Sequence, residues 1–320
     1  MHPDITTIEC HYIQPGRACA FLVREGDEAT FIDANTNKAV PYLLEALRNQ
    51  GLTPEQVRYI VITHVHLDHA GGAAELLSHC PNATILCHPK AARHLVSPDR
   101  LVAASKQVYG EELFDRFYGH IGPCAAERVR VMADDEVLQW GTRTFRFLHT
   151  LGHATHHLCV LDNTTNALFA GDNFGICYPQ LAQGLRPYIF VACTPTEYDP
   201  THTRASLERM LATGSRVFYM NHYGPFAVTE ALIEQFLHSV SRTESIIQLA
   251  ADSGLVDTEL RAFINAHVRA ATEEELNRCG FELNETTGYW VEPDIALNSN
   301  GLYFAVLKRL RKNGAVSANQ

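Results

Sequence analysis

Apolar and polar residues alternate with two different periods along the first third of the chain. Short apolar runs between turn residues predict strands, and apolar residues at helical spacing predict the helices that connect them. Residues 19–34 hold two such runs around Gly26-Asp27, which predicts a hairpin. A helical pattern over about 40–50 then precedes the apolar run YIVIT at 59–63, which predicts a buried strand. A further helix and the strand pattern at 83–88 follow, as is typical of a β-α-β unit.

A second group of strand patterns begins at residue 128. Apolar runs separated by turn residues between 128 and 172 predict a second sheet. A helix is expected over about 202–213 and a strand over 216–221. Beyond residue 229 the patterns are helical, with one over 294–311, and the one strand signal there lies around Tyr289-Trp290. The sequence therefore predicts an α+β fold whose C-terminal part is helical.

Composition narrows the kinds of partner and compartment. The net charge of −10 argues against a nucleic-acid partner, because such binding depends on clustered Lys and Arg. The first residues have neither a basic start nor a long apolar run, so we expect no membrane association and a cytoplasmic location. The nine cysteines are odd in number and include no C-x-x-C pair, so we expect most of them to be buried free thiols.

The segment THVHLDHAGG at 63–72 places four potential metal ligands directly after the buried strand. His64 and His66 are separated by one residue and so point the same way from an extended chain. A following turn brings Asp68 and His69 toward a second point nearby. One short loop can therefore serve two adjacent ions.

This motif resembles the H-x-H-x-D-H signature of the metallo-β-lactamase-fold hydrolases. Three further motif positions with ligand-type residues follow in the family's order, each at an expected strand end. They are His153 in HTLGHATHH, Asp172 in AGDNFG and His222 in MNHYG. Their spacing is similar to that of the glyoxalase II-like branch. The resemblance covers roughly residues 10–225 and implies a four-layer αβ/βα metallo-β-lactamase sandwich.

The resemblance also implies a role for each ligand. His64, His66 and His153 would hold one metal ion, and Asp68, His69 and His222 would hold a second. Asp172 would bridge the two ions. Neutral imidazoles suit borderline ions, so Zn²⁺ is expected first, with Fe²⁺ or Mn²⁺ as alternatives. A water molecule shared by two such ions would have its pKa lowered to about 7, which makes hydroxide the expected nucleophile.

By the same resemblance the chain divides into a catalytic domain over 1–228 and a helical extension over 229–320 that borders the active site. The loop at 180–200 resembles that of a less-defined bacterial and archaeal group in this branch. Tyr188 and Phe190 in this loop are expected to shape an apolar substrate cleft, with ordinary loop packing as the alternative.

The candidate catalytic residues are Asp68, which belongs to the motif, and Tyr223, which follows the ligand His222. Tyr223 would donate a hydrogen bond to an oxyanion or a leaving group, although packing is the commoner use of such a tyrosine. His156 and His157 are expected to support the ligands rather than to bind metal. The remaining histidines have no matching position in the motif set.

The reaction expected is metal-dependent hydrolysis of an ester, thioester or lactone in a small-molecule substrate. Phosphodiester or phosphotriester cleavage is the alternative, because the same two-metal clamp serves in-line displacement. A mono-iron persulfide-type dioxygenase and a non-catalytic ligand sensor are alternatives of another class. His66 disfavours a diiron reductase, whose motif usually carries Glu there. The apolar faces of the C-terminal helices around Trp290 suggest a homodimer surface, with core packing as the alternative.

Overall fold

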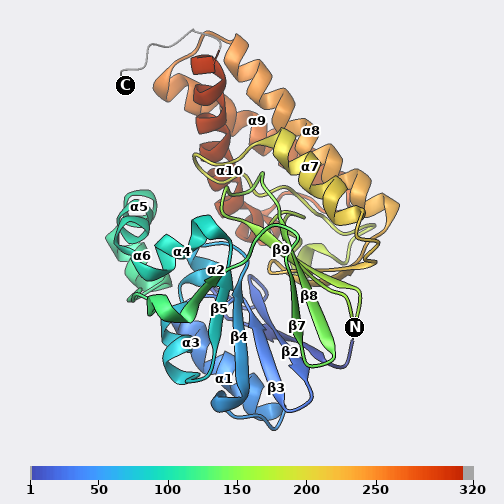
Figure 1. The fold of residues 1–320 in the computed structure, drawn as a ribbon. Coiled ribbons are helices and arrows are strands. Elements are labelled where there is room, and N and C mark those ends of the chain that lie inside the picture. Colours follow the sequence, from blue (N-terminus) through green and yellow to red (C-terminus); the bar gives the residue numbers. More distant parts are fainter. Residues whose placement is uncertain (1, 313–320) are drawn as a thin grey trace. The chain divides into compact units, whose positions relative to one another are not determined.

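The computed structural model describes residues 2–312, which form two compact units (Figure 1). The first unit comprises the chain up to Thr150 together with His156–Gly171 and Met210–Ala227. The second comprises Leu151–Thr155, Asp172–Arg209 and the chain from Val228 onward. The predicted division at residue 228 into a catalytic domain and a helical extension remains a prediction.

Six strands make the first sheet, in the order β1-β2-β3-β4-β5-β6. They are β1 Ile5–Glu9, β2 Cys19–Glu25, β3 Glu28–Ile32, β4 Val57–Ile62, β5 Thr84–Cys87 and β6 Val129–Val131. β1, β2 and β3 pair antiparallel, whereas β3, β4, β5 and β6 pair parallel. The hairpin predicted around Gly26-Asp27 is confirmed, since β2 and β3 pair up to Glu25 and Glu28.

The second sheet also has six strands, in the order β12-β11-β10-β9-β8-β7. They are β7 Val137–Trp140, β8 Arg143–His149, β9 Leu158–Asp162, β10 Ala167–Gly171, β11 Val217–Met220 and β12 Gly224–Ala227. Only β10 and β11 pair parallel, so this sheet is mixed like the first. The two sheets and their helices confirm the predicted α+β fold.

The strand pattern at residues 128–132 was expected in the second sheet, and that prediction is wrong. This segment forms β6, which pairs parallel with β5 at the edge of the first sheet. The chain between β5 and β6 runs through three helices, and such a helical crossover returns a strand parallel to the one before it. A short strand pattern predicts that a strand forms, but it does not predict which of two sheets the strand joins.

The first unit holds the helices α1 Val40–Asn49, α2 Leu67–Ala70, α3 Ala73–His79, α4 Pro89–Val96, α5 Asp99–Tyr109 and α6 Glu111–Phe117. Of these, α1, α3 and α4 contribute buried residues to the cluster on the outer face of the first sheet. Leu43 of α1 and Leu76 of α3 belong to one buried cluster with Ile60 of β4. Val61 of β4 belongs to the other cluster, between the sheets. β4 is thus buried on both faces, which explains its continuous apolar run.

Aromatic side chains fill the space between the two sheets. Phe21 of the first sheet lies 5.4 Å, between ring centroids, from both Phe169 and Tyr219 of the second sheet. All three are almost completely buried and belong to the cluster between the sheets. This packing holds the strand ends of both sheets in fixed positions, so the loops that follow them start from a rigid base.

The second unit is helical for most of its length. Its helices are α7 Pro200–Leu211, whose last two residues are grouped with the first unit, α8 Glu230–Asp252, α9 Asp257–Arg278 and α10 Glu285–Lys312. α10 packs against both α8 and α9. Among residues 2–312, none of the helices has the length and apolar character that crossing a membrane requires.

The strand signal around Tyr289-Trp290 was misleading, because both residues lie inside α10. Trp290 is buried and its ring lies 5.4 Å from that of Tyr178, so its bulk serves helix packing. Pro293 lies within the same helix, which therefore begins well before the pattern that predicted it from residue 294. Proline is tolerated there although it removes one backbone hydrogen bond. All nine cysteines are buried free thiols, which the sequence predicted for most of them.

A buried arginine joins the edge of the second sheet to the first strands. Arg143, at the start of β8, is only 1% exposed and pairs with Asp162 at the end of β9, which is fully buried. The same guanidinium lies 3.0 Å from the carboxylate of Asp4 and 3.5 Å from that of Glu25. A buried charge is stable only when it is paired, so each partner depends on the other.

We expect Arg143→Met to lower the free energy of unfolding by about 3–5 kcal/mol, because it leaves the Asp162 carboxylate buried without its counter-charge. Urea unfolding monitored by circular dichroism measures this loss. The matched control is Arg146→Met on the same strand, whose ion pair with Asp135 is exposed and whose loss should cost less than about 1 kcal/mol. Equal losses in the two variants would contradict the role given to Arg143.

Candidate metal centre

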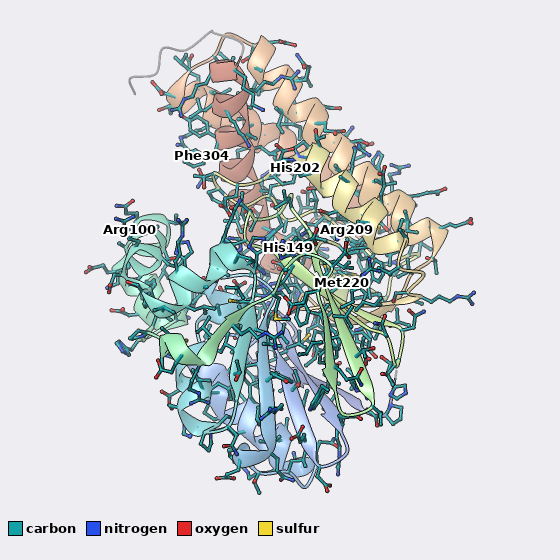
Figure 2. The ribbon with its side chains drawn as sticks, viewed as in Figure 1. Arg100, His149, His202, Arg209, Met220 and Phe304 are labelled. Atoms are coloured by element: carbon teal, nitrogen blue, oxygen red, sulfur yellow. The ribbon has the colours of Figure 1, made fainter. Side chains whose placement is uncertain are left out.

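The seven predicted ligands follow strand ends. β4 ends at Ile62, and His64 and His66 lie in the turn that leads into α2. β8 ends at His149 and β11 at Met220, both labelled in Figure 2, and these ends precede the predicted ligands His153 and His222. Strand ends are the positions where side chains emerge from a rigid sheet into a loop, and this is where binding residues concentrate.

The turn after β4 is tight because another segment passes close to it. Asp68 and His69 lie in the single-turn helix α2, and Gly72 is the N-cap of α3, which begins at Ala73. A Cβ atom at Gly72 would lie 2.6 Å from the carbonyl oxygen of Ala34 and 2.7 Å from that of Thr36. The absence of a side chain at Gly72 therefore allows the backbone after β3 to pack closely against the segment that follows the motif turn.

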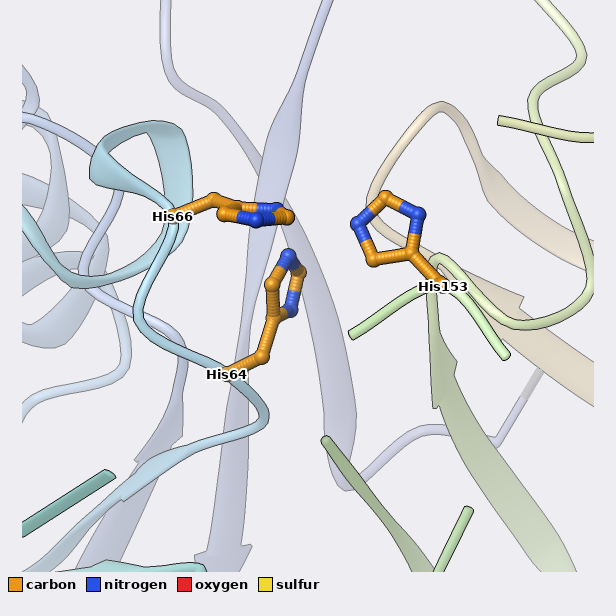
Figure 3. A group of neighbouring side chains, drawn as sticks. All are labelled: His64, His66 and His153. Carbon is orange, nitrogen blue, oxygen red and sulfur yellow. The ribbon is translucent and has the colours of Figure 1, made fainter. Parts of the chain in front are cut away.

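Five of the seven predicted ligands gather in the first unit: His64, His66, Asp68, His69 and His222. One ligand atom from each of Asp68, His69 and His222 lies within 4.8 Å of the other two. The ring of His64 lies 4.0 Å from that of His69, between centroids. It lies 4.5 Å from the ring of His66, and these two rings are drawn in Figure 3.

The other two predicted ligands belong to the second unit. His153 follows β8, and Asp172 directly follows β10. The Nε2 atom of His153 lies 3.4 Å from Oδ2 of Asp172, and both residues are almost completely buried. His153 is the third side chain labelled in Figure 3. Each unit thus presents its own group of imidazole and carboxylate side chains.

Acceptors in the first unit fix the ring protons of two predicted ligands. Nδ1 of His69 lies 2.9 Å from Oδ2 of Asp33, and Nδ1 of His222 lies 2.7 Å from the carbonyl oxygen of Arg17. A carboxylate and a carbonyl oxygen can only accept, so each Nδ1 carries the proton and donates it. The lone pair of each ring is then on Nε2, and for His222 this atom lies 3.3 Å from Oδ2 of Asp68.

Asp33 also reaches His64, through Thr63. The Thr63 hydroxyl donates to Asp33 Oδ2 at 2.7 Å, while the Thr63 backbone N–H donates to Oδ1 at 2.8 Å. With its own proton committed to Asp33, the hydroxyl oxygen accepts from Nδ1 of His64 at 3.2 Å. One buried carboxylate therefore fixes the protonation of two histidines.

Two contacts fix His153 in the same way within the second unit. Its Nδ1 donates to the carbonyl oxygen of Ala192 at 3.1 Å. Its backbone N–H donates to Oδ1 of Asn173 at 3.2 Å. Asn173 directly follows Asp172, so the segment that carries one predicted ligand also orients the other.

The sequence did not identify Asp33, Thr63 or the acceptor carbonyls of Arg17 and Ala192. Asp33 had one signal, because it directly follows β3 and so belongs with the other residues at strand ends. It also has a φ of +60°, a left-handed backbone conformation in which glycine, Asn and Asp are favoured. The backbone carbonyls had no signal, since every residue type carries one.

The histidines expected to support the ligands do contact them or their loop. His157 is buried, its Nδ1 lies 2.9 Å from the Thr150 hydroxyl, and its ring lies 5.0 Å from that of His64. Nδ1 of His156 accepts from the backbone N–H of Val65, between His64 and His66. Both therefore contact the turn that carries the motif, and their supporting role remains a prediction.

His88 illustrates the histidines outside the motif. Its Nδ1 accepts from the backbone N–H of Lys90 at 3.0 Å and so caps α4. Burial, together with the neighbouring His149, lowers the pKa of His88 to about 4, which keeps the ring neutral near pH 7. It is a satisfied core histidine, as expected for residues without a motif position.

Tyr223 and the loop aromatics are buried or half-buried. The Tyr223 hydroxyl donates to Glu9 at 3.2 Å and its ring packs on the core between the sheets. Burial, together with the nearby Glu9, raises the pKa of the Tyr223 phenol. Tyr188 and Phe190 are buried and stack with a centroid separation of 5.2 Å. The catalytic role expected for Tyr223 and the cleft expected at Tyr188 and Phe190 remain predictions.

The donor set fits borderline divalent ions. Histidine Nε2 atoms and carboxylate oxygens are the ligands that Zn²⁺, Fe²⁺ and Mn²⁺ accept in proteins. Ligand histidines in metal sites usually donate their other N–H to a carboxylate or a backbone carbonyl, and His69, His153 and His222 all do so. Both the ligand types and their outer contacts are therefore those of a metal centre.

Known proteins resemble parts of this chain in sequence. A metallo-beta-lactamase fold-containing protein of Sulfurisphaera tokodaii is 28% identical over 225 residues, which is 69% of this chain and 80% of that protein. The atrochrysone carboxyl ACP thioesterase of Aspergillus chevalieri is 30% identical over 155 residues, or 48% of this chain. That match spans only 39% of the thioesterase's own length.

Solved structures share the fold. A metallo-beta-lactamase family protein of Thermus thermophilus superposes with a TM-score of 0.66 at 20% identity, covering 100% of this chain and 97% of that one. An archaeal metallo-beta-lactamase superfamily protein from Sulfolobus tokodaii gives the same TM-score and identity over 95% of this chain and 99% of that one. A family model described as the metallo-beta-lactamase superfamily matches residues 14–222. The chain therefore belongs to the metallo-β-lactamase superfamily of metal-dependent hydrolases.

Proposed function

We propose that this chain is a dinuclear metal-dependent hydrolase of the glyoxalase II-like branch that cleaves an ester, thioester or lactone. One observation carries the proposal: His64, His69, His153 and His222 each have Nδ1 directed at an acceptor. All four rings then hold their lone pair on Nε2, the protonation state that metal ligation requires. Buried histidines that served packing alone would not need a common tautomer.

The motif order assigns the ligands to the two ions. His64, His66 and His153 would hold one ion, and Asp68, His69 and His222 the other, with Asp172 shared. The second of these groups is supported within the first unit, where its three ligand atoms lie within 4.8 Å of one another. Zn²⁺ is the ion we expect first, with Fe²⁺ and Mn²⁺ as alternatives.

Two divalent ions would supply a hydroxide nucleophile near pH 7 and a positive charge that polarises the carbonyl oxygen. The protein's own groups do the positioning. Asp33 holds the Nδ1 proton of His69 directly and that of His64 through Thr63. These side chains are fully buried, so water does not compete for their hydrogen bonds and the rings keep their orientation.

Two relatives favour a thioester within this substrate class. The Aspergillus protein described above is an acyl-carrier-protein thioesterase by name, and a second relative, from Emericella nidulans, is named a thioesterase and is 27% identical over 117 residues. This chain matches 39% and 24% of their respective lengths. We therefore place a thioester first and leave the acyl group open.

We expect protein purified without added metal to contain two divalent ions per chain and to hydrolyse thioesters with a higher kcat/KM than phosphodiesters. Chelation should reduce the rate to background, because the nucleophile depends on the ions. Elemental analysis and a panel of thioester, ester, lactone, aryl phosphodiester and phosphotriester substrates test both points.

Three results would contradict the proposal. The highest kcat/KM on a phosphoester would replace the substrate class. One iron per chain, with oxygen consumed in the presence of a persulfide, would indicate a dioxygenase. Tight binding of a small molecule without turnover of any substrate would indicate a sensor.

We expect Asp33→Asn to weaken metal binding by about 10–100-fold. The asparagine oxygen can still accept from the Thr63 backbone N–H, but its NH₂ group then faces His69 Nδ1 and repels a proton there. His69 would shift its proton to Nε2, the ligand atom. Competition with a chromophoric chelator for Zn²⁺ measures the affinity.

The matched control is Glu75→Gln, the same carboxylate-to-amide change beside His79 on α3. That pair is exposed, with 3.3 Å between Oε1 and Nε2, and its loss should leave metal affinity unchanged. An Asp33→Asn protein that binds Zn²⁺ as tightly as the control would refute the role of Asp33.

A further inference from the structure

The predicted ligand His153 is held by a segment that belongs to none of the metal motifs. The Ala192 carbonyl accepts from His153 Nδ1 at 3.1 Å, and the Thr194 hydroxyl donates to the His153 carbonyl oxygen at 2.5 Å. Residues 191–194 form no helix or regular strand. A backbone carbonyl orients a ring only if the backbone itself is fixed, so something must hold this segment.

Helix α10 holds it through one side-chain amide. Asn298 Oδ1 accepts from the backbone N–H of Cys193 at 2.7 Å, and Asn298 Nδ2 donates to the carbonyl oxygen of Val191 at 3.1 Å. These two contacts lie on either side of Ala192. The backbone N–H of Val191 donates in turn to the Ser239 hydroxyl of α8 at 3.0 Å. The peptides flanking Ala192 are thereby fixed from two helices.

The same face of α10 approaches the loops at two further points. Asp294, one turn before Asn298, accepts from the Tyr178 hydroxyl at 2.9 Å. Gly301, one turn after it, lies so close that an added Cβ would overlap the carbonyl oxygen of Cys193. Residues spaced by three and four positions share one helix face, so this face is fitted to the loops along two turns.

The held segment also braces the loop of Asp172. Ile176 and Phe190 exchange two backbone hydrogen bonds, of 2.9 and 3.1 Å. Gly175 donates back to the Asp172 carbonyl at 3.0 Å, and an added Cβ at Gly175 would overlap the Phe190 carbonyl oxygen. Both predicted ligands of the second unit therefore depend on residues 190–194.

We propose that Asn298 is a positioning residue for the metal ligand His153. Its amide fixes the Val191 and Cys193 peptides so that the Ala192 carbonyl accepts the His153 Nδ1 proton and the lone pair stays on Nε2. This gives the C-terminal helices a defined part in metal binding. The inference rests on the proposed function only in requiring that His153 ligates a metal ion.

The test is a Co²⁺ titration of the metal-free full-length chain, because Co²⁺ commonly substitutes for Zn²⁺ and reports its ligands by visible absorption. His153→Ala first identifies the binding step and absorption band that depend on this ligand. Asn298→Asp keeps the side-chain size and the acceptor for Cys193 but places an oxygen against the Val191 carbonyl. We expect it to weaken the His153-dependent step by about 10–100-fold and to alter its band, with the other step unchanged.

Asn300→Asp is the matched control on the same helix. Asn300 accepts from Arg261 at the exposed side of α10, away from residues 191–194, so both steps should match those of the parent chain. Asn298→Ala, which adds no charge, provides the same reading if the aspartate variant does not fold. Urea unfolding of each variant reports any loss of overall stability.

Two results would overturn the inference. Asn298 variants that titrate like Asn300→Asp would show that His153 does not need this contact. Variants that weaken both steps equally, with a lower urea midpoint, would show a role in stability alone. If Asn298→Asp weakens the His153-dependent step as expected and the parent chain hydrolyses no substrate, the proposed function is refuted and the role of Asn298 is supported.

Discussion

The position of one proton on each predicted ligand imidazole is the constraint on which the candidate metal centre depends. A neutral histidine has a single N–H, and a ring that carries it on Nε2 cannot ligate through that atom. Asp33 settles this for His69 and, through Thr63, for His64. The carboxylate is buried, where an unsatisfied charge would be costly, and its three hydrogen bonds are what make it stable there.

The two packed sheets hold Asp33 and the turn that carries His64 in fixed positions. β3 and β4 are parallel neighbours, so Asp33 and the turn carrying His64 leave the same edge of the sheet. Ile32 of β3 and Val61 of β4 belong to the buried cluster between the sheets, which fixes the face of those strands that is turned toward the second sheet. Shifts of even about half an ångström at the strand ends would lengthen the bond from Asp33 to His69, so packing in the core determines the geometry at the edge.

Features that depend on residues close together in the sequence were predicted, and features that depend on distant contacts were missed. The motif at 63–72 was recognisable because four ligand-type side chains are close in sequence, and His153, Asp172 and His222 because each follows an apolar run. The sheet that receives β6 depends on a crossover that no local pattern records. Pro293 concealed the start of α10, since tertiary packing of Trp290 and its neighbours outweighed the local preference.

The predicted metal ligands all precede β12 in the sequence, yet a helix after β12 helps to orient one of them. It does so through a backbone hydrogen-bond acceptor. When a carboxylate such as that of Asp33 orients a predicted ligand, the orienting group is a side chain, and its position at a strand end can be recognised in the sequence. When a backbone carbonyl such as that of Ala192 orients the ring, every residue type could supply it. The orientation then depends on the side chains that hold this peptide in place. A side-chain amide presents its NH₂ donors and its carbonyl acceptor in one plane, so that it can bond at once to the carbonyl oxygen of Val191 and the N–H of Cys193 on either side of Ala192. Asn298 supplies this amide from α10, so a helix far along the chain takes the part that a second buried carboxylate would otherwise have to play.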